Sequence, residues 1–424
     1  MENQSLWSIK PYKEAISMND KVSAQKNDNN ATQIQKRSGP LAGVRVIDLT
    51  AMVMGPYCTQ MMADMGADVI KVEPPGGDGT RYISPGPIPA MGGVFVNVNR
   101  GKRSIVLDLR KNEDIEVLRE LIKTADVFIH SMRAKAINKL GFSYEDVSTL
   151  NPSIVYTNCY GYSRRGPDAD LPAYDDTIQA ECGIPMVQQM LTGEVNYVGS
   201  IMADKIAGMT ALYATVMALF HRERTGEGQE VEIGMFEAMA SFMLVEHANG
   251  MLFDPPLGPA NYHRAVAPNR RPYQTKDGYI SALVYNDKQW SQFMGAVKPH
   301  WESEDYATLE QRAKQINTLY GLLGETFKER TTEEWLNLLR ELGIPAAPLR
   351  TPDELFENPH LNAVEFFQTV ESPYGDLRFP GVPTWFSKSP GSVAGPAPIV
   401  GADTASIYEE IGFNKPAGEA NSAP

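Results

Sequence analysis

Short runs of aliphatic and β-branched residues alternate with helical patterns in the first half of the chain. Residues 44–49 form an apolar run that is typical of a buried strand, and residues 68–72 form a second one. Between them Gly55-Pro56 breaks the chain, after which residues 57–65 have the pattern of a helix. A strand, a helix and a strand within about 30 residues make a βαβ unit, whose two strands run parallel.

The alternation continues beyond this unit. Further strands are predicted at residues 104–109, 126–130 and 154–157, and helices at 112–124 and 134–140. The first of these helices carries its apolar residues on one face. The succession predicts an α/β fold with a doubly wound, Rossmann-like parallel sheet.

The second half of the chain has a different pattern. Beyond Asp175 the periodicity is helical, and residues 204–222 form a long predicted helix with small residues that suggest close packing against a neighbour. Residues 249–271 are rich in Gly, Pro and Asn and are predicted to be a linker. Residues 273–280 then indicate a hairpin that turns at an Asp-Gly pair.

Three helices and a proline-rich tail follow the hairpin. The helices are predicted at residues 287–297, 309–328 and 333–342, and the tail at 351–398 is expected to return to the first domain. The expected parts are a flexible leader at 1–38, a discontinuous large α/β domain made of 39–250 and 350–424, and a small α+β domain at 268–349.

Composition narrows the classes of partner. The 424 residues include 39 Lys and Arg against 52 Asp and Glu, which gives a formal charge of −13. Such a chain lacks the concentrated basic surface that nucleic acids require, although a few local cations could still bind an anionic ligand. Three cysteines without a CxxC pair favour a reducing compartment. The longest apolar stretches, such as residues 209–220, are too short to span a membrane, and the polar N-terminus lacks a signal-peptide core, so we expect a cytoplasmic protein.

Several common chemistries have no motif in this sequence. Six scattered histidines without an HExxH spacing argue against a metal site. The first predicted strand is not followed by GxGxxG, and neither a Walker loop nor a GxSxG elbow occurs. Carboxylate chemistry remains, with Asp175 and Asp204 as its candidates. Asp204 is expected where a loop enters the long helix, so the helix dipole would keep it ionised; an ordinary helix cap is the alternative.

Several motifs occur in an order and spacing that resemble one family. They lie at residues 41–56, 66–74, 99–109, 160–162 with 166–167, and 224–229, and fainter matches follow at 277–278 and 343–345. Together they resemble the family III CoA-transferases, the CaiB/BaiF family that includes formyl-CoA and crotonobetainyl-CoA transferases.

This resemblance implies an enzyme that moves coenzyme A from an acyl-CoA donor to a free carboxylic acid. Asp204 matches the family's nucleophilic aspartate, which forms a mixed anhydride and then an aspartyl-CoA thioester. The resemblance also implies acyl-CoA and a carboxylic acid as substrates, no permanently bound cofactor, and a homodimer whose subunits interlock.

The CoA-contacting positions carry over less uniformly. The resemblance places them at Val53, Met54, Leu107, Asp108, Leu109, Arg110, Ser131, Met132, Arg133, Lys139, Tyr174 and Asp175. Lys139 stands where the family usually has arginine. Lysine keeps the positive charge but lacks the planar guanidinium group that binds a phosphate through two parallel hydrogen bonds. His130 and the two residues after it replace a Glu-Asn-Phe pattern, and Pro74 stands where some members have a basic residue.

Local positive charge could offset the acidic composition at a phosphate site. The candidates are Arg100, Lys102, Arg103, Arg133 and Lys139, near the predicted strand ends. For the first three, a solvated strand edge is the alternative reading.

Two other functions stay open. An α-methylacyl-CoA racemase would need histidine just before the acid at Asp175, where this chain has Tyr174, and a non-catalytic CoA-binding protein would not need Asp204. The sequence does not identify the acyl group of the donor or the acceptor acid. Residues 52–54 would suit a non-polar acyl group, whereas Arg264, Arg270 or Arg271 could hold a polar acid.

Overall fold

The structure is a computed structural model of the chain, and it describes residues 37–413. All but the last two residues of the predicted leader at 1–38 lie outside this part. Within residues 37–413, no helix combines the length and the apolar character needed to cross a membrane.

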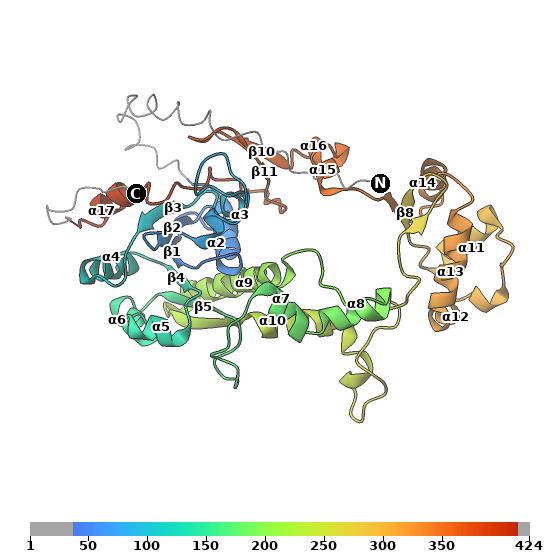
Figure 1. Cartoon of the computed structure of the whole chain (residues 1–424), viewed down its shortest axis with the longest axis horizontal. Helices are drawn as coiled ribbons and strands as arrows, with labels where there is room; N and C mark the ends of the chain where they lie inside the picture. The colour runs from blue at the N-terminus through green and yellow to red at the C-terminus, as the bar shows by residue number, and fades with distance from the viewer. Residues whose placement is uncertain (1–36, 414–424) are drawn as a thin grey trace, which may run out of the picture. The chain divides into compact units, whose positions relative to one another are not determined.

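Six parallel strands form the central sheet (Figure 1). They are β1 (Arg45–Leu49), β2 (Asp68–Glu73), β3 (Arg103–Val106), β4 (Val127–His130), β5 (Val155–Tyr160) and β6 (Gln229–Gly234). Their order, β3-β2-β1-β4-β5-β6, is that of a doubly wound nucleotide-binding sheet. The predicted α/β fold with a doubly wound parallel sheet is therefore confirmed.

Helices cover both faces of this sheet, which is why its strands are almost continuously apolar. One face packs on α2 (Met54–Asp64), α9 (Met202–Thr225) and α10 (Met235–His247). The other packs on α4 (Asn112–Lys123), α5 (Ala134–Lys139), α6 (Tyr144–Leu150) and α17 (Thr404–Glu410). Along β1, Val46 belongs to the first core and Ile47 to the second, so neighbouring residues point to opposite faces.

Some predicted boundaries are wrong. Helix α2 begins at Met54 rather than at residue 57, because Pro56 lies in its first turn, where a backbone N–H is not needed for the helix. Strand β3 ends at Val106 rather than at residue 109, because the Asp108 carboxylate accepts the Arg110 N–H and closes a turn. Strand β6 was not predicted; Gly226 ends α9 with a φ of 80°, as expected for a C-cap.

A smaller α+β part follows the linker, in agreement with the predicted hairpin. Its antiparallel sheet contains β7 (Tyr273–Gln274), β8 (Tyr279–Ala282) and β9 (Ala346–Pro348), and its helices are α11 (Asp287–Val297), α12 (Leu309–Lys314), α13 (Ile316–Phe327) and α14 (Thr332–Glu341). Phe293, Phe327 and Trp335 lie in its core. The helix predicted at 309–328 is two helices, since Gln315 leaves the helical conformation between them.

The proline-rich tail contacts the earlier part of the chain. It contains α15 (Pro352–Leu355), α16 (Pro359–Ala363) and the antiparallel pair β10 (Phe367–Val370) and β11 (Leu377–Pro380). Phe379 packs in one cluster with Phe95 of α3 (Gly93–Val98), and Arg81 donates to the Pro398 carbonyl at 3.2 Å. The domain boundaries themselves stay a prediction.

Three cations expected at the ligand edge of the sheet are instead structural. Arg100 pairs with Asp64 at 2.7 Å and Lys102 with Asp48 at 3.0 Å, and both pairs are buried. Arg103 lies at the amino end of β3 and pairs with Asp68 at 2.6 Å. Their carboxylate partners come from other elements, so these cations are engaged in ion pairs rather than in a phosphate site. Arg100 and Lys102 are also buried, and Arg103 is partly solvated.

Removing the ammonium of Lys102 should be costly. In Lys102→Met the buried Asp48 carboxylate loses its closest cation, so we expect the free energy of unfolding to fall by about 3 to 5 kcal/mol. Arg103→Met is the control, with an expected loss of about 0 to 1 kcal/mol, because that pair is partly solvated. Urea unfolding of both variants measures the difference, and equal losses would contradict the assignment.

Candidate active site

The sheet changes winding direction between β1 and β4, which are neighbours although their helices α2 and α5 cover opposite faces. In such sheets ligands bind where the loops after these two strands separate. Here the two loops are joined, because the Ala51 N–H after β1 donates to Ser131 Oγ after β4 at 3.0 Å.

Asp204 lies beside this point, in the first turn of α9. Its carboxylate reaches across to α2, where Oδ1 accepts the Met54 N–H at 3.2 Å. The two helices can approach this closely because of Gly208, one turn later: a Cβ there would lie 2.6 Å from the Met54 carbonyl oxygen. A carboxylate bonded to a second helix does more than an ordinary cap of its own helix.

A second carboxylate supports the first from α7 (Asp175–Glu181). Asp175 is 9% exposed; its Oδ1 accepts the Asp204 N–H at 3.0 Å, and its Oδ2 accepts Gln179 Nε2 at 2.5 Å. Gln179 in turn donates to the Ser200 carbonyl and accepts the Val198 N–H. Sequence reasoning missed Gln179, although its place one turn after Asp175 was a usable signal.

The electrostatics follow from this arrangement. Burial and then the nearby Asp175 carboxylate disfavour a charge on Asp204 and raise its pKa to about 6, against the Met54 N–H, which favours the charge. Asp204 is thus ionised at neutral pH but held less stably than an exposed carboxylate, as a nucleophile requires. Within the described residues, no three His, Cys, Asp or Glu side chains gather as a metal ion would require.

The structure brings together only some of the other predicted positions. Val53 and Met54 are buried at the start of α2, and Ser131 lies in the loop that meets Ala51. Tyr174 is 67% exposed at the start of α7. Met132 and Arg133 continue the loop after β4, and Lys139 is exposed at the end of α5.

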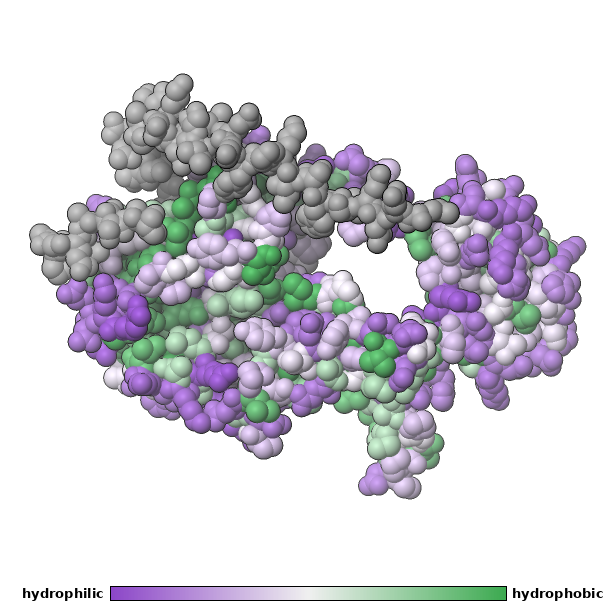
Figure 2. All heavy atoms as spheres, viewed as in Figure 1, coloured by the Kyte–Doolittle hydropathy of each residue, from purple (hydrophilic) through white to green (hydrophobic). Residues whose placement is uncertain are grey.

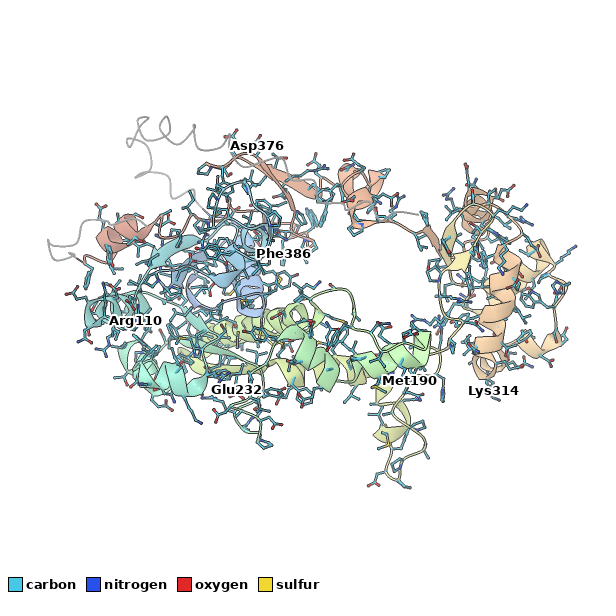
Figure 3. All side chains as sticks on the ribbon, viewed as in Figure 1. Arg110, Met190, Glu232, Lys314, Asp376 and Phe386 are labelled. Carbon is cyan, nitrogen blue, oxygen red and sulfur yellow. The ribbon has the colours of Figure 1, made fainter. Side chains whose placement is uncertain are left out.

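Residues 107–110 lie farther along the same edge, after β3. Leu107 is buried, and its N–H donates to the Glu73 carbonyl at 2.9 Å. Asp108 and Arg110 form a bidentate pair, and the Arg110 side chain, 83% exposed, is labelled in Figure 3. Two strands separate this loop from the one after β4, because β2 and β1 intervene in the sheet.

His130 takes part in holding the loop after β4, a role that sequence reasoning missed. Its ring is buried, Nδ1 accepts the Met132 N–H at 3.2 Å, and Nε2 lies 3.0 Å from the Tyr156 hydroxyl, which donates to the Phe142 carbonyl. Burial lowers the pKa of His130 to about 4, so the ring is neutral at neutral pH. The sequence signal was the departure from Glu-Asn-Phe at this strand end.

Comparisons with known proteins identify the family of this chain. The model of "CoA-transferase family III" matches residues 41–404. A succinate–glutarate CoA-transferase of Agrobacterium fabrum is 32% identical, over 90% of this chain and 98% of that protein, and a succinyl-CoA:mesaconate CoA-transferase of Haloarcula hispanica is 31% identical, over 88% and 97%. The crystal structure of a CaiB/BaiF family protein from Brucella suis superposes with a TM-score of 0.74 at 30% identity and covers 88% of this chain and all of that one.

The match to the family model spans the six-stranded sheet, the smaller α+β part and most of the tail. It therefore covers every element that carries a candidate site residue. The chain belongs to family III of the CoA-transferases, the CaiB/BaiF family, and is an acyl-CoA:carboxylate CoA-transferase.

Proposed function

We propose that Asp204 is the nucleophile that carries CoA between the two acids. The observation that supports this most directly is the position of its carboxylate at the switch point of the sheet, bonded to the Met54 N–H and facing Asp175. A half-buried carboxylate with a raised pKa is a better nucleophile than a solvated one.

The transfer proceeds in two halves: two steps move CoA from the donor to Asp204, and two further steps move it from Asp204 to the acceptor. Asp204 Oδ attacks the thioester carbonyl of the donor and expels CoA thiolate, which leaves a mixed anhydride between the donor acid and Asp204. The thiolate then attacks the aspartyl carbonyl, releasing the donor carboxylate and leaving an aspartyl-CoA thioester. The acceptor carboxylate attacks this thioester and expels CoA thiolate, which leaves a second mixed anhydride between the acceptor acid and Asp204. The thiolate finally attacks the acceptor carbonyl of this anhydride, which releases the Asp204 carboxylate and forms the new acyl-CoA.

The Met54 N–H has a defined role in this sequence. Each step places negative charge on an oxygen of a tetrahedral centre, and the N–H at the start of α2, with the positive end of that helix, lies beside the aspartyl group. When the tetrahedral centre forms at the aspartyl carbonyl, this donor stabilises the developing oxyanion.

CoA itself is proposed to lie along the carboxyl edge of the sheet. Support comes from the loops after β3 and β4, which carry the exposed cations Arg110 and Arg133, and from Lys139 at the end of α5. Arg133 and Lys139 remain for the phosphates after Arg100, Lys102 and Arg103 pair internally, and Arg110, although it pairs with Asp108, is exposed in the loop after β3.

The names of the relatives support a class of substrate. Those proteins are named for succinate, glutarate and mesaconate, which are short dicarboxylates. We propose acids of this class as donor and acceptor here. Arg264, a candidate for a polar acid, instead donates to the Tyr320 hydroxyl at 2.7 Å.

The racemase alternative is disfavoured by the residue before Asp175. Tyr174 stands there, at the surface, and provides no imidazole to move a proton near neutral pH. Transfer needs no α-proton exchange, so the arrangement of two carboxylates and one backbone N–H suffices for it.

A homodimer is also proposed, with a second copy of this chain covering an apolar face of α9. Met209, Tyr213, Met217 and Phe220 recur at helical spacing along this helix, and each is more than half exposed. Phe242 and Val245 add exposed apolar surface on α10. On the face of the molecule seen in Figure 2, hydrophobic residues, drawn in green, lie at the surface among hydrophilic ones, drawn in purple. Such a continuous face is typical of an interface.

The nucleophile is tested by trapping. Incubation with succinyl-CoA and hydroxylamine should place a hydroxamate on Asp204, detectable by peptide mass spectrometry, and Asp204→Asn should lower kcat by at least about 10³-fold. Asp176→Asn, the neighbour of Asp175 and exposed on α7, is the control and should keep full activity. Full transfer by Asp204→Asn would refute the proposal.

The pH profile tests the electrostatics. Because Asp204 must be ionised and has a pKa of about 6, kcat/KM should fall about tenfold per pH unit below that value. Asp175→Asn removes the neighbouring negative charge, so the acidic limb should move to lower pH, by about one unit. A limb that moves upward in this variant would contradict the arrangement.

The dimer is tested by light scattering. The wild-type mass should be twice 46.8 kDa at micromolar concentration. Met217→Glu, on the apolar face of α9, should lower the mass towards the monomer, because a charge would be buried at the interface. Tyr279→Glu, at an exposed residue of β8, is the matched control. A monomeric wild type would exclude this assembly.

A further inference from the structure

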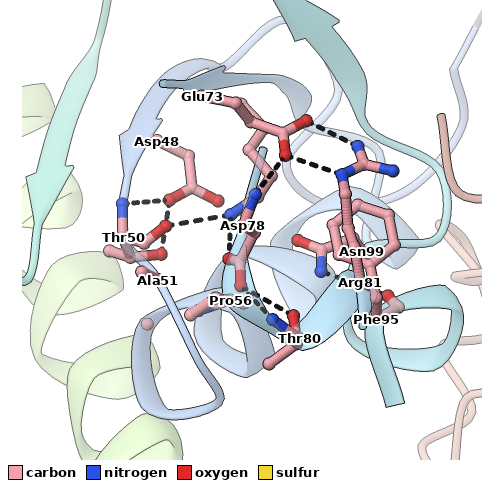
Figure 4. A network of polar contacts seen from close by, with 12 residues as sticks. Asp48, Thr50, Ala51, Pro56, Glu73, Asp78, Thr80, Arg81, Phe95 and Asn99 are labelled. Carbon is pink, nitrogen blue, oxygen red and sulfur yellow. Dashed lines mark hydrogen bonds and ion pairs between the residues drawn. The ribbon is translucent and has the colours of Figure 1, made fainter. Parts of the chain in front are cut away.

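A network of six buried ionic groups lies beneath the loop after β1 (Figure 4). Its cations are Lys71, Arg81 and Lys102, and its anions are Asp48, Glu73 and Asp78. The charges balance, yet burying them costs solvation that well-packed apolar residues would not lose. A network of this kind in a CoA-transferase calls for a function besides stability.

The network binds both backbone groups of Thr50, the first residue of the loop. Asp48 Oδ1 accepts the Thr50 N–H at 2.8 Å and also accepts its hydroxyl. Lys71 Nζ donates to the Thr50 carbonyl at 2.9 Å and lies 3.0 Å from Asp78 Oδ2. Thr50 is thus fixed from two sides by charged groups of β1 and β2.

The residues that follow Thr50 need such support. Met52 has a φ of 68°, in the left-handed region that non-glycine residues rarely adopt. Gly55 lies so close to Thr50 that a Cβ would be 2.3 Å from the Thr50 Cβ. The loop is therefore a tight and strained turn, and Met54, whose N–H binds Asp204, directly follows it.

We propose that Lys71 is a positioning residue for CoA transfer: by fixing the Thr50 carbonyl it keeps the Met54 N–H aimed at the Asp204 carboxylate. The inference rests on the proposed role of Asp204. Lys71 is buried and is not one of the groups that face Asp204, which are Asp175 from α7 and the Met54 N–H from α2.

The other cations of the network do not have this contact. Lys102 binds the Pro56 carbonyl and Asn99, and Arg81 binds Glu73 and stacks 3.6 Å from the Phe95 ring. Burial disfavours the charge of Lys71, but Asp48, Asp78 and Glu73 outweigh it and raise the pKa of Lys71. Lys71 therefore stays charged over the working range and contributes no acidic limb of its own.

The test replaces Lys71 by a neutral residue of similar length. In Lys71→Met we expect kcat at pH 8 to fall about tenfold or more, because the N–H no longer meets the reacting group. The acidic limb of kcat/KM should also rise by about one pH unit, since the Met54 N–H lowers the pKa of Asp204. A purely structural role would reduce the folded fraction without moving that limb.

A control and a second variant separate the loop from general effects. Arg100→Met breaks a comparably buried pair at the far end of α2, so it should lose stability but keep the wild-type pH limb. The double variant Lys71→Met with Asp78→Asn leaves the net charge unchanged and removes the unpaired carboxylate. It should fold if the single variant does not and should show the same raised limb, which then reports the loop and not the charge.

The outcomes are distinct. A wild-type limb and undiminished kcat in both Lys71 variants, with the wild-type enzyme still trapped at Asp204 by hydroxylamine, would overturn the positioning role alone. Absence of trapping in the wild type would overturn the nucleophile assignment. A raised limb in Arg100→Met equal to that in the Lys71 variants would also overturn the positioning role.

Discussion

The arrangement depends on the close crossing of α2 and α9 at Gly208. Because this position has no side chain, the Met54 carbonyl can lie close to α9 at Gly208, one turn after Asp204, and the Asp204 carboxylate meets the N–H at the start of α2. The contact joins the helix that follows β1 to a helix that begins some 150 residues later. It also places a negative charge at the positive end of both helices, which lowers the cost of keeping a half-buried carboxylate ionised.

The buried ion pairs on the other side of the loop after β1 also fix the geometry of the site through contacts between separate elements. The ion pairs of Lys71 and Lys102 lie under the residues that shape the site, and their partners come from β1 and from the turn after β2. Buried pairs contribute little net stability, but each donor in this network has a fixed acceptor. His130 does for the loop after β4 what Thr50 and its charged neighbours do for the loop after β1: a neutral ring accepts the Met132 N–H. The network therefore contributes more to the geometry of the loop than to the free energy of unfolding.

Some elements of the fold have a signal in the local sequence, and others do not. Strands β1, β2 and β4 were predictable because they are short apolar runs, and α9 because its periodicity is helical. Strand β6 was missed, since Glu230 and Glu232 interrupt its apolar pattern; it is an edge strand, and both pair with Arg164. The cations at 100–103 were misassigned because their carboxylate partners lie between 35 and 307 residues away in the sequence.

The sequence by itself determined the class of sheet, the family and the place of Asp204 at the start of a long helix. These follow from periodicity, helix-terminus chemistry and motif order, which are properties of neighbouring residues. Only the tertiary structure decided what Asp204 touches, that its pKa rises to about 6, and which cations are used up in ion pairs. Those properties depend on burial and on charges from distant segments, and a linear sequence does not display either.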